Sequence, residues 1–256
     1  MNRRGVGAAA LVLLLTGEAR AAGSRPRFEP TDLQLENPGV TELDLQTGVL
    51  YGDGPAGLRL SLVDFELDLG LLPRVELDLD GAFALNNLET STPAVTGESL
   101  WTAVKLGFLD SRSAAGTSAF SLGAQLGPRI ATVGEYGAGY EGLALLGLYK
   151  DRTHVVLNGG GILDPGPARG TVRPLGIVGG VDLDLDLDAK NRWSLLAELG
   201  VGYFLRAYPA EVTVTAGFGF SPNKSLAFSL ILLGGLVPGG DRLGLLFGVA
   251  PKTSLW

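Results

Sequence analysis

Acidic side chains recur at every second position in several segments of this chain. Residues 182–188 place four aspartates on alternate positions with leucine between them, and the same alternation returns at residues 42–45, 64–69 and 76–80. A group of carboxylates attracts cations, repels anions and can ligate hard metal ions. Because successive side chains of a strand point to opposite faces, each segment would carry carboxylates on one face and apolar groups on the other. The pattern predicts strands with one watery and one apolar face.

Twelve segments combine this alternation with flanking turn residues, as β-strands do. Most reach the ~9 to 11 residues that a tilted membrane strand needs, whereas strands in soluble sheets average ~5 to 6. The segments span residues 40–51, 58–69, 74–85, 99–109, 117–127, 138–149, 153–163, 172–188, 193–204, 209–220, 225–236 and 242–250. We therefore predict an all-β fold, an antiparallel up-and-down transmembrane β-barrel of about twelve strands, with ten or fourteen as alternatives.

The connections between these segments alternate in length. Tight turns at residues 71–73, 150–152 and 189–192 alternate with longer, glycine-rich connections such as residues 86–98 and 164–171. Short periplasmic turns and long outer loops are typical of bacterial outer-membrane barrels. An even number of strands would leave both ends of the chain in the periplasm.

The second predicted strand changes the face of its apolar residues. Leu58, Leu60 and Leu62 share one face, whereas Phe65 and the leucines after it have the opposite parity. A β-bulge adds one residue to a strand and reverses the parity beyond it. We predict a bulge near residues 63–64, which would restore a single lipid-facing side.

The two ends of the chain differ from the predicted barrel. Residues 1–21 have the basic start, short apolar stretch and small-residue cleavage site of a secretory signal peptide. Residues 22–39 contain three prolines and are predicted to be a periplasmic lead-in, which leaves residues 40–256 for the barrel. Without residues 1–21 the chain has 17 basic and 26 acidic groups, a net charge of −9 that argues against a nucleic-acid partner. The last residues, 251–256, either extend a bent final strand or form a tail.

The alternating acids gather in the periplasmic half of the lumen if the first strand rises from the periplasm. The candidate residues are Glu42, Asp44, Glu66, Asp68, Glu76, Asp78, Asp80, Asp184, Asp186 and Asp188, with Arg59 and Lys105 as lumenal bases. One interpretation is a hydrated wall whose carboxylates pair with neighbouring basic groups. The other is a cation-favouring zone that acts in selectivity. A dedicated calcium site is a further alternative, because the carboxylates offer many oxygen ligands. Strict alternation is not the usual loop geometry of such sites, so no metal ligand is assigned.

Aromatic and large apolar side chains are predicted to occupy two places. An interfacial girdle would hold Tyr51, Trp101, Tyr140, Tyr203 and Tyr208 near the outer ends of strands, and Tyr149 and Trp193 near the inner ends. By parity, a second set would point inward and narrow the lumen: Trp101, Leu146, Leu196, Phe204, Ile231 and Leu246.

Catalysis has little support in the sequence. His154 is the sole histidine, and no nucleophile motif accompanies it. The glycine-rich stretches at residues 134–139 and 159–161 are followed by no predicted helix, so they do not fit phosphate-binding loops. We predict no enzyme activity, no catalytic residues and no cofactor.

Residues 42–54 and 64–77 resemble the front of a family of outer-membrane transporters grouped under the meta-pathway of phenol degradation. In that family a strand of Asp-Phe-Glu-Leu type leads to a Gly-Leu turn with an arginine before Glu-Leu. Gly70, Leu71, Arg74, Glu76 and Leu77 match that pattern here. The resemblance covers about residues 42–85 and implies an outer-membrane barrel that passes small molecules, including aromatic or apolar ones.

Together these features predict a monomeric barrel of the bacterial outer membrane, folded by the barrel-assembly machinery and surrounded by lipid, that passes a small-molecule solute. An alternative is a structural or adhesive surface barrel with a filled lumen and ligand-binding outer loops. A soluble periplasmic β-sandwich explains the alternation but neither the strand lengths nor the alternating connections.

Overall fold

The computed structural model describes residues 33, 35–52, 57–86, 88–89, 93–110, 118–237 and 241–256. The predicted signal peptide lies outside the described residues. The strands are β1 (Val40–Gly52), β2 (Leu58–Leu72), β3 (Val75–Asn86), β4 (Ala94–Gly97), β5 (Leu100–Asp110), β6 (Ser118–Ile130), β7 (Ala138–Lys150), β8 (Thr153–Leu163), β9 (Leu175–Asp186), β10 (Trp193–Arg206), β11 (Glu211–Asn223), β12 (Leu226–Gly235) and β13 (Asp241–Ser254). In this part of the chain no helix is long and apolar enough to cross a membrane.

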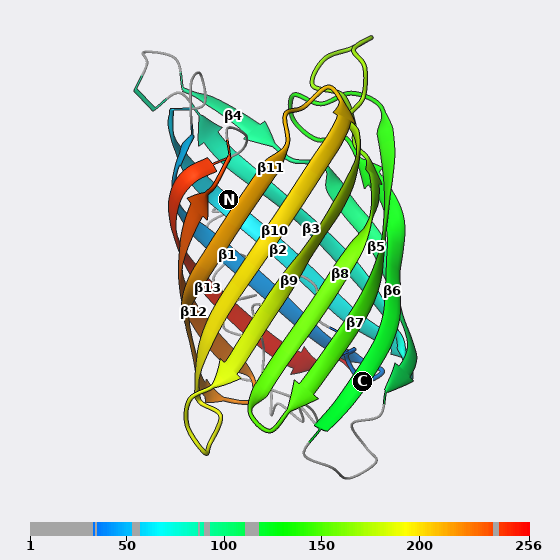
Figure 1. The fold of residues 1–256 in the computed structure, drawn as a ribbon, viewed down its shortest axis with the longest axis vertical. Coiled ribbons are helices and arrows are strands. Elements are labelled where there is room, and N and C mark those ends of the chain that lie inside the picture. Colours follow the sequence, from blue (N-terminus) through cyan, green and yellow to red (C-terminus); the bar gives the residue numbers. More distant parts are fainter. Residues whose placement is uncertain are drawn as a thin grey trace, which may run out of the picture.

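The strands form a closed antiparallel barrel (Figure 1). Neighbours in sequence pair with one another, and β1 also pairs with β13, which closes the ring. The short β4 and the longer β5 pair with different parts of β3, so together they form one wall segment. The barrel therefore has twelve wall segments, and the predicted fold is confirmed.

The two ends of the barrel differ. One end, called here the short-turn end, carries the turn at residues 73–74, the turn at 151–152, the start of β1 and the end of β13. The other, the long-loop end, carries connections such as residues 131–137 and 164–174. The predicted alternation of connection lengths is present in part, because six residues join β9 to β10 at the short-turn end and only four join β10 to β11 at the long-loop end. The strand bounds agree with the predicted ones to within a few residues.

The outer surface of the barrel is an apolar band. Large side chains exposed on it come from strands all around the ring: Val49, Leu62, Val104, Leu122, Leu126, Leu148, Leu157, Val181, Leu199, Val214, Phe218, Leu230, Leu232, Leu245 and Phe247. Residues of the opposite parity, such as Asp182 and Ser229, are buried inside the ring. A soluble protein does not expose so wide an apolar surface, whereas a membrane barrel requires it.

The predicted bulge in β2 is present. Against β3, the register of β2 shifts between Ser61 and Val63. Against β1, Ser61 pairs with Gly48 and Asp64 pairs with Gln46, so β2 has one residue more than β1 between these two pairs. The extra residue places Asp64 on the lumenal side with Glu66 and Asp68. It also leaves Leu62 and Phe65 on the same outer face.

An arginine on the middle of the outer band should weaken the barrel. Leu199 lies halfway along β10 and faces outward. Leu199→Arg is expected to lower the free energy of unfolding by about 2–4 kcal/mol, because a cation would be held near the middle of the lipid. Urea unfolding in lipid vesicles measures this change in the free energy of unfolding. Leu236→Arg, just beyond the end of β12, is the control and should cost about 0–1 kcal/mol. Equal losses for both would contradict the lipid-facing assignment.

The girdle prediction is partly wrong. Tyr51, Tyr140, Tyr203 and Trp193 are exposed near strand ends. Trp101, however, is buried in the lumen. Tyr149 also faces inward, where its hydroxyl lies 3.2 Å from Ser121 Oγ and its ring meets His154 edge-on. Tyr208 lies between β10 and β11 and packs against Phe204.

The structure also decides the direction of Leu146 and the role of residues 251–256. Leu146 faces outward, and its buried neighbour Leu145 faces inward, so the inward assignment of Leu146 was wrong. Both neighbours are leucine because the lumen is itself apolar at that level. At the C-terminus β13 continues through Pro251, with Lys252 buried on the lumenal side, so most of residues 251–256 belong to the last strand.

Candidate functional site

Two rows of carboxylates cross β1, β2 and β3 on the lumenal side. In the row nearer the short-turn end, Glu42 pairs in register with Asp68, which pairs with Asp78. In the next row, Asp44 pairs with Glu66, which pairs with Asp80. Like charges placed opposite one another across strands destabilise a sheet unless cations offset them. The lumen is therefore built to hold positive charge beside these strands.

Two buried lysines supply part of that charge. Lys105 Nζ lies 3.0 Å from Glu76 Oε1, 3.6 Å from Asp78 Oδ2 and 3.9 Å from Asp68 Oδ1. Lys252 Nζ lies 2.9 Å from Glu42 Oε2. Gln125 Nε2 also donates to Asp78 Oδ2 at 2.7 Å. The row nearer the short-turn end is thus a buried network with its own cations.

Part of this network has the spacing of a metal site. One carboxylate oxygen from each of Glu66, Asp68 and Asp78 lies within 4.8 Å of the other two. Lys105 Nζ is within 4 Å of both aspartates, so an ammonium already offsets their charge. The arrangement serves as an ion-pair network and gives no reason to assign a metal.

The acids of β9 divide between the lumen and the turn beyond it. Asp182, Asp184 and Asp186 are buried, and Asn158 Nδ2 donates to Asp182 Oδ2 at 3.0 Å. Asp188 is not lumenal as predicted, because β9 ends at Asp186. Its carboxylate accepts the backbone N–H groups of Trp193, at 2.9 Å, and Arg192, at 2.6 Å. The Trp193 bond is the main cause of a lowered pKa for Asp188.

The two predicted lumenal bases have different partners. Lys105 lies within the acidic rows, as described above. Arg59 pairs instead with Asp241, with Nε 2.9 Å from Oδ1, near the long-loop end. It therefore stands apart from the rows of acids.

A second cluster of interacting side chains, centred on Arg129, was not predicted from the sequence. It lies in the half of the lumen towards the long-loop end, called here the upper lumen. Arg129 binds the Glu141 carboxylate, donates to Ser99 Oγ at 3.0 Å and lies over the Trp101 ring at 5.5 Å from its centroid. Arg129 lies on β6 beyond the end of the predicted strand 117–127, and a lone arginine in a predicted connection gives no signal that distinguishes it from a surface residue.

Two adjoining cavities occupy the upper lumen. The larger has a volume of about 310 Å³ and the smaller about 290 Å³, and Asp80, Arg129 and Glu198 line both. The described residues that line the larger cavity include seven carboxylates and one basic group, Arg129: the acids are Asp44, Asp64, Glu66, Asp80, Glu98, Asp182 and Glu198. Leu196, Ile231 and Leu246 form an apolar part of its wall, as the inward parity predicts. The upper lumen is acidic and is not filled by side chains.

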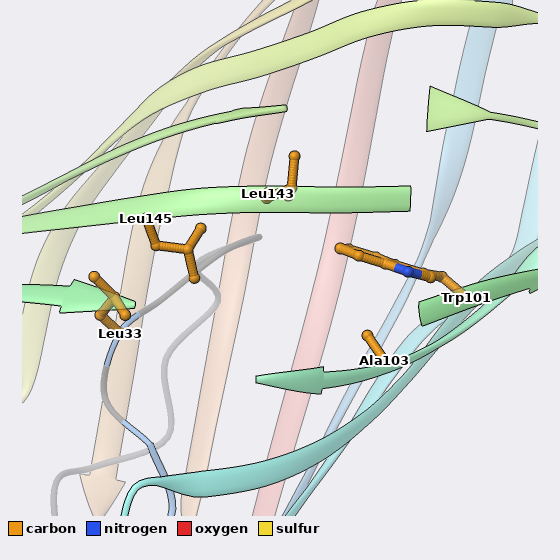
Figure 2. Packing of buried hydrophobic residues seen from close by; sticks show 5 residues of the cluster. All are labelled: Leu33, Trp101, Ala103, Leu143 and Leu145. Carbon is orange, nitrogen blue, oxygen red and sulfur yellow. The ribbon is translucent and has the colours of Figure 1, made fainter. Parts of the chain in front are cut away.

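The described part of the predicted lead-in lies inside the barrel at the short-turn end. Leu33 packs in a buried cluster with Trp101, Ala103, Leu143 and Leu145, all on lumenal positions (Figure 2). A Cβ atom on Gly123 would lie only 2.6 Å from Leu33 Cδ2. The lead-in therefore does not stop outside the barrel. We call residues 33 and 35–39 the inner segment.

Polar contacts hold the inner segment to β13 and to the neighbouring strands β2 and β3. The Glu36 carboxylate binds Lys252 of β13, and the Glu36 backbone N–H donates to Glu76 Oε2 of β3. Gly39 N donates to Gly70 O of β2 at 2.8 Å. A side chain on Gly70 would collide with the backbone carbonyls of Glu36 and Asn37. These contacts fix the inner segment in the lumen at the short-turn end.

Comparison with known proteins gives fold-level similarity only. No family model and no curated protein matches the chain, so membership of the phenol meta-pathway family stays a prediction. Among solved structures, the CymD monoaromatic hydrocarbon channel has a TM-score of 0.42 and 8% identity over 85% of this chain and 89% of that chain. The translocator domain of autotransporter NalP from Neisseria meningitidis has a TM-score of 0.41 and 14% identity over 83% of this chain and 86% of its own. Similarity at this level carries no solute and no activity over to this chain.

The location of the protein follows from its own architecture. A closed ladder leaves no unpaired edge, which is the condition for a sheet to lie in lipid. The exposed apolar band and the acidic, partly hollow interior meet the other two requirements of a membrane barrel. The chain is an integral β-barrel of the bacterial outer membrane.

Proposed function

We propose that this barrel passes small solutes across the outer membrane and that the inner segment closes it at the short-turn end. The observation that carries the proposal is the unfilled upper lumen, whose larger cavity has about 310 Å³ of space. Below it the inner segment, which is not part of the wall, lies in the lumen, where an ion pair and backbone hydrogen bonds join it to the wall. Such a segment can leave the lumen without unfolding the barrel.

The charges of the lumen determine which solutes we expect the barrel to prefer. The acidic zone attracts cations and repels anions, and low-dielectric walls strengthen that field. The resemblance to the phenol meta-pathway family suggests aromatic or apolar solutes, for which the leucine and isoleucine wall of the larger cavity is the supporting feature. We propose that cationic or neutral solutes pass and that anions are disfavoured.

Flux through the mature chain in lipid vesicles tests the proposal. Swelling in isotonic small solutes should exceed that of protein-free vesicles, with amines entering faster than carboxylates of equal size. Asp80→Asn removes one charge shared by both cavities and should reduce the preference for amines. Asp188→Asn, in the turn beyond β9, is the matched control and should leave it unchanged. Vesicles that stay sealed to every solute, even when the inner segment is removed, would refute passage.

One observation favours a second function. The short-turn half of the lumen is well packed, with Lys105, Gln125 and Leu145 almost fully buried. A structural or adhesive barrel with a closed lumen would have such an interior and would act through its outer loops. The predicted outer loop at residues 86–98 contains the wall strand β4, so the part to shorten is residues 87–93, between β3 and β4. Cell adhesion that is lost on shortening residues 87–93, with no flux in the vesicle test, would support this alternative.

A further inference from the structure

Exposed basic side chains gather at the short-turn end, although the chain as a whole is acidic, with a formal net charge of −7. Four turns at this end lie wholly within the described residues: 73–74, 151–152, 187–192 and 224–225. All four lie at the same end of the barrel (Figure 1), and each has an exposed Lys or Arg in it or directly beside it. These residues are Arg74, Lys150, Arg152, Lys190, Arg192 and Lys224. We call them the basic rim.

Few acidic groups offset the basic rim. Among the described residues beside it, the carboxylates are Asp110, Asp151 and Asp188. The Asp188 carboxylate is engaged within its own turn, where it accepts two backbone N–H groups and lies 3.6 Å from Arg192 Nε. The acidic rows of the lumen lie on the other side of the wall and have cations of their own. Six basic groups against three acidic ones therefore leave the rim positive on its exposed side.

Exposed apolar side chains lie directly next to the basic rim. Trp193 follows Arg192 in the chain, is 46% exposed and packs against Phe220 with ring centroids 4.5 Å apart. Leu72 and Leu187, in or beside two of the same turns, are also exposed. An aromatic ring at headgroup level with basic groups beside it is the arrangement found where a membrane protein meets the lipid–water interface. The basic rim is therefore at the height of lipid headgroups.

The spacing of the basic rim indicates which kind of anion it fits. A small dissolved anion is held by donors that converge on one point, whereas these side chains come from four separate turns around the ring. A layer of lipid headgroups is an extended surface that meets all these turns at once. Attraction to such a surface accumulates over separated basic groups and fades within a Debye length, ~10 Å at 0.1 M salt. The arrangement therefore favours a lipid surface over a dissolved anion.

We propose that the basic rim binds anionic phospholipids, such as phosphatidylglycerol, in the inner leaflet of the outer membrane. Short turns lie on the periplasmic side of bacterial outer-membrane barrels, which places the rim beside that leaflet. The Arg and Lys side chains donate to the lipid phosphate, and Trp193 lies among the lipids at headgroup level. This contact does not depend on solute passage, so a sealed barrel would keep it.

Tryptophan fluorescence tests the proposal on the chain that begins at residue 22. Trp193 and Trp256 are exposed at the short-turn end, whereas Trp101 is buried in the lumen and is shielded from lipid. The protein is folded in phosphatidylcholine vesicles in which part of the lipid is replaced by brominated phosphatidylglycerol. A parallel series uses brominated phosphatidylcholine. Because bromine quenches an indole that it contacts, the two series give the relative affinity of each lipid for the positions beside the exposed tryptophans.

At low salt, phosphatidylglycerol should bind at these positions about fivefold more tightly than phosphatidylcholine, which is the contribution of one basic side chain at an anionic surface. At about 1 M NaCl the Debye length falls to ~3 Å, and the advantage should disappear. Equal quenching by the two lipids at low salt would overturn the proposal. Loss of the advantage on adding millimolar glycerol phosphate would also overturn it, because a dissolved anion would then compete for a compact site.

A matched pair of double variants assigns the effect to the rim. Lys190→Gln with Lys224→Gln removes two exposed cations from the turns on either side of Trp193 and should reduce the advantage of phosphatidylglycerol to less than about twofold. Arg169→Gln with Arg206→Gln removes the same charge from exposed positions at the long-loop end and should leave the advantage unchanged. An equal loss in both double variants would show an effect of net charge alone and would refute the rim as the binding surface.

Discussion

A chain shortened to begin at Gly39 is expected to conduct ions steadily in planar bilayers, whereas a chain that begins at residue 22 conducts only in rare openings. The reason is the inner segment, which packs Leu33 into the lumenal cluster and joins Glu36 to Lys252 of β13. Removing it takes away lumenal atoms that we propose close the short-turn end, and leaves the twelve wall segments intact. Single-channel recording measures the difference.

A peptide of residues 22–38 is the control for this experiment. Added in excess to the shortened chain from the short-turn side, it should lower the conductance again, and a scrambled peptide of the same composition should not. Because the apolar wall strands are unchanged, the shortened chain should also keep its resistance to unfolding in detergent. An equally low conductance of the shortened and full chains would show that the wall side chains close the lumen instead.

Lys105→Met is expected to be the most destabilising single substitution in the acidic rows. Lys105 is 1% exposed and lies between Glu76, Asp78 and Asp68. Methionine fills a similar volume but leaves these buried carboxylates without their cation, a loss of about 3–5 kcal/mol. Urea unfolding in micelles measures it.

Two variants identify the cause of that loss. Lys190→Met removes the same charge from the exposed turn after β9 and should change stability by less than about 0.5 kcal/mol. Adding Asp78→Asn to Lys105→Met removes one of the uncompensated carboxylates and should recover part of the lost stability. If the double variant is less stable than Lys105→Met, packing rather than charge is the main contribution of Lys105.

The fold was predictable because lipid and water impose one rule on every strand. Alternation and strand length identify β1 to β13 to within a few residues, apart from the short β4, and even the parity change around Leu62 and Phe65 locates the bulge. The rule fails where both faces become apolar. At Leu145 and Leu146 the sequence does not say which residue faces inward, because the lumen there is lined for contact with Leu33.

The site was predictable only in part. The acidic rows follow from the alternation, but Arg129 and Glu141 stand as single charges in their strands and meet only when β6 and β7 are aligned. The inner segment has no periodicity, and its position depends on Gly70 and Gly123, whose missing side chains leave room for it. Such complementarity exists between distant parts of the chain and cannot be read from either part alone.

The seam between β1 and β13 fixes the order in which the protein assembles. Val40 pairs with Ser254, so the first and last strands meet only after the whole chain has been delivered, and contacts so distant in sequence form late. The inner segment is continuous with β1, and its partner Lys252 lies on β13. The segment is therefore captured as the ring closes, and the ion pair of Glu36 with Lys252 is a contact that only a completed barrel can make.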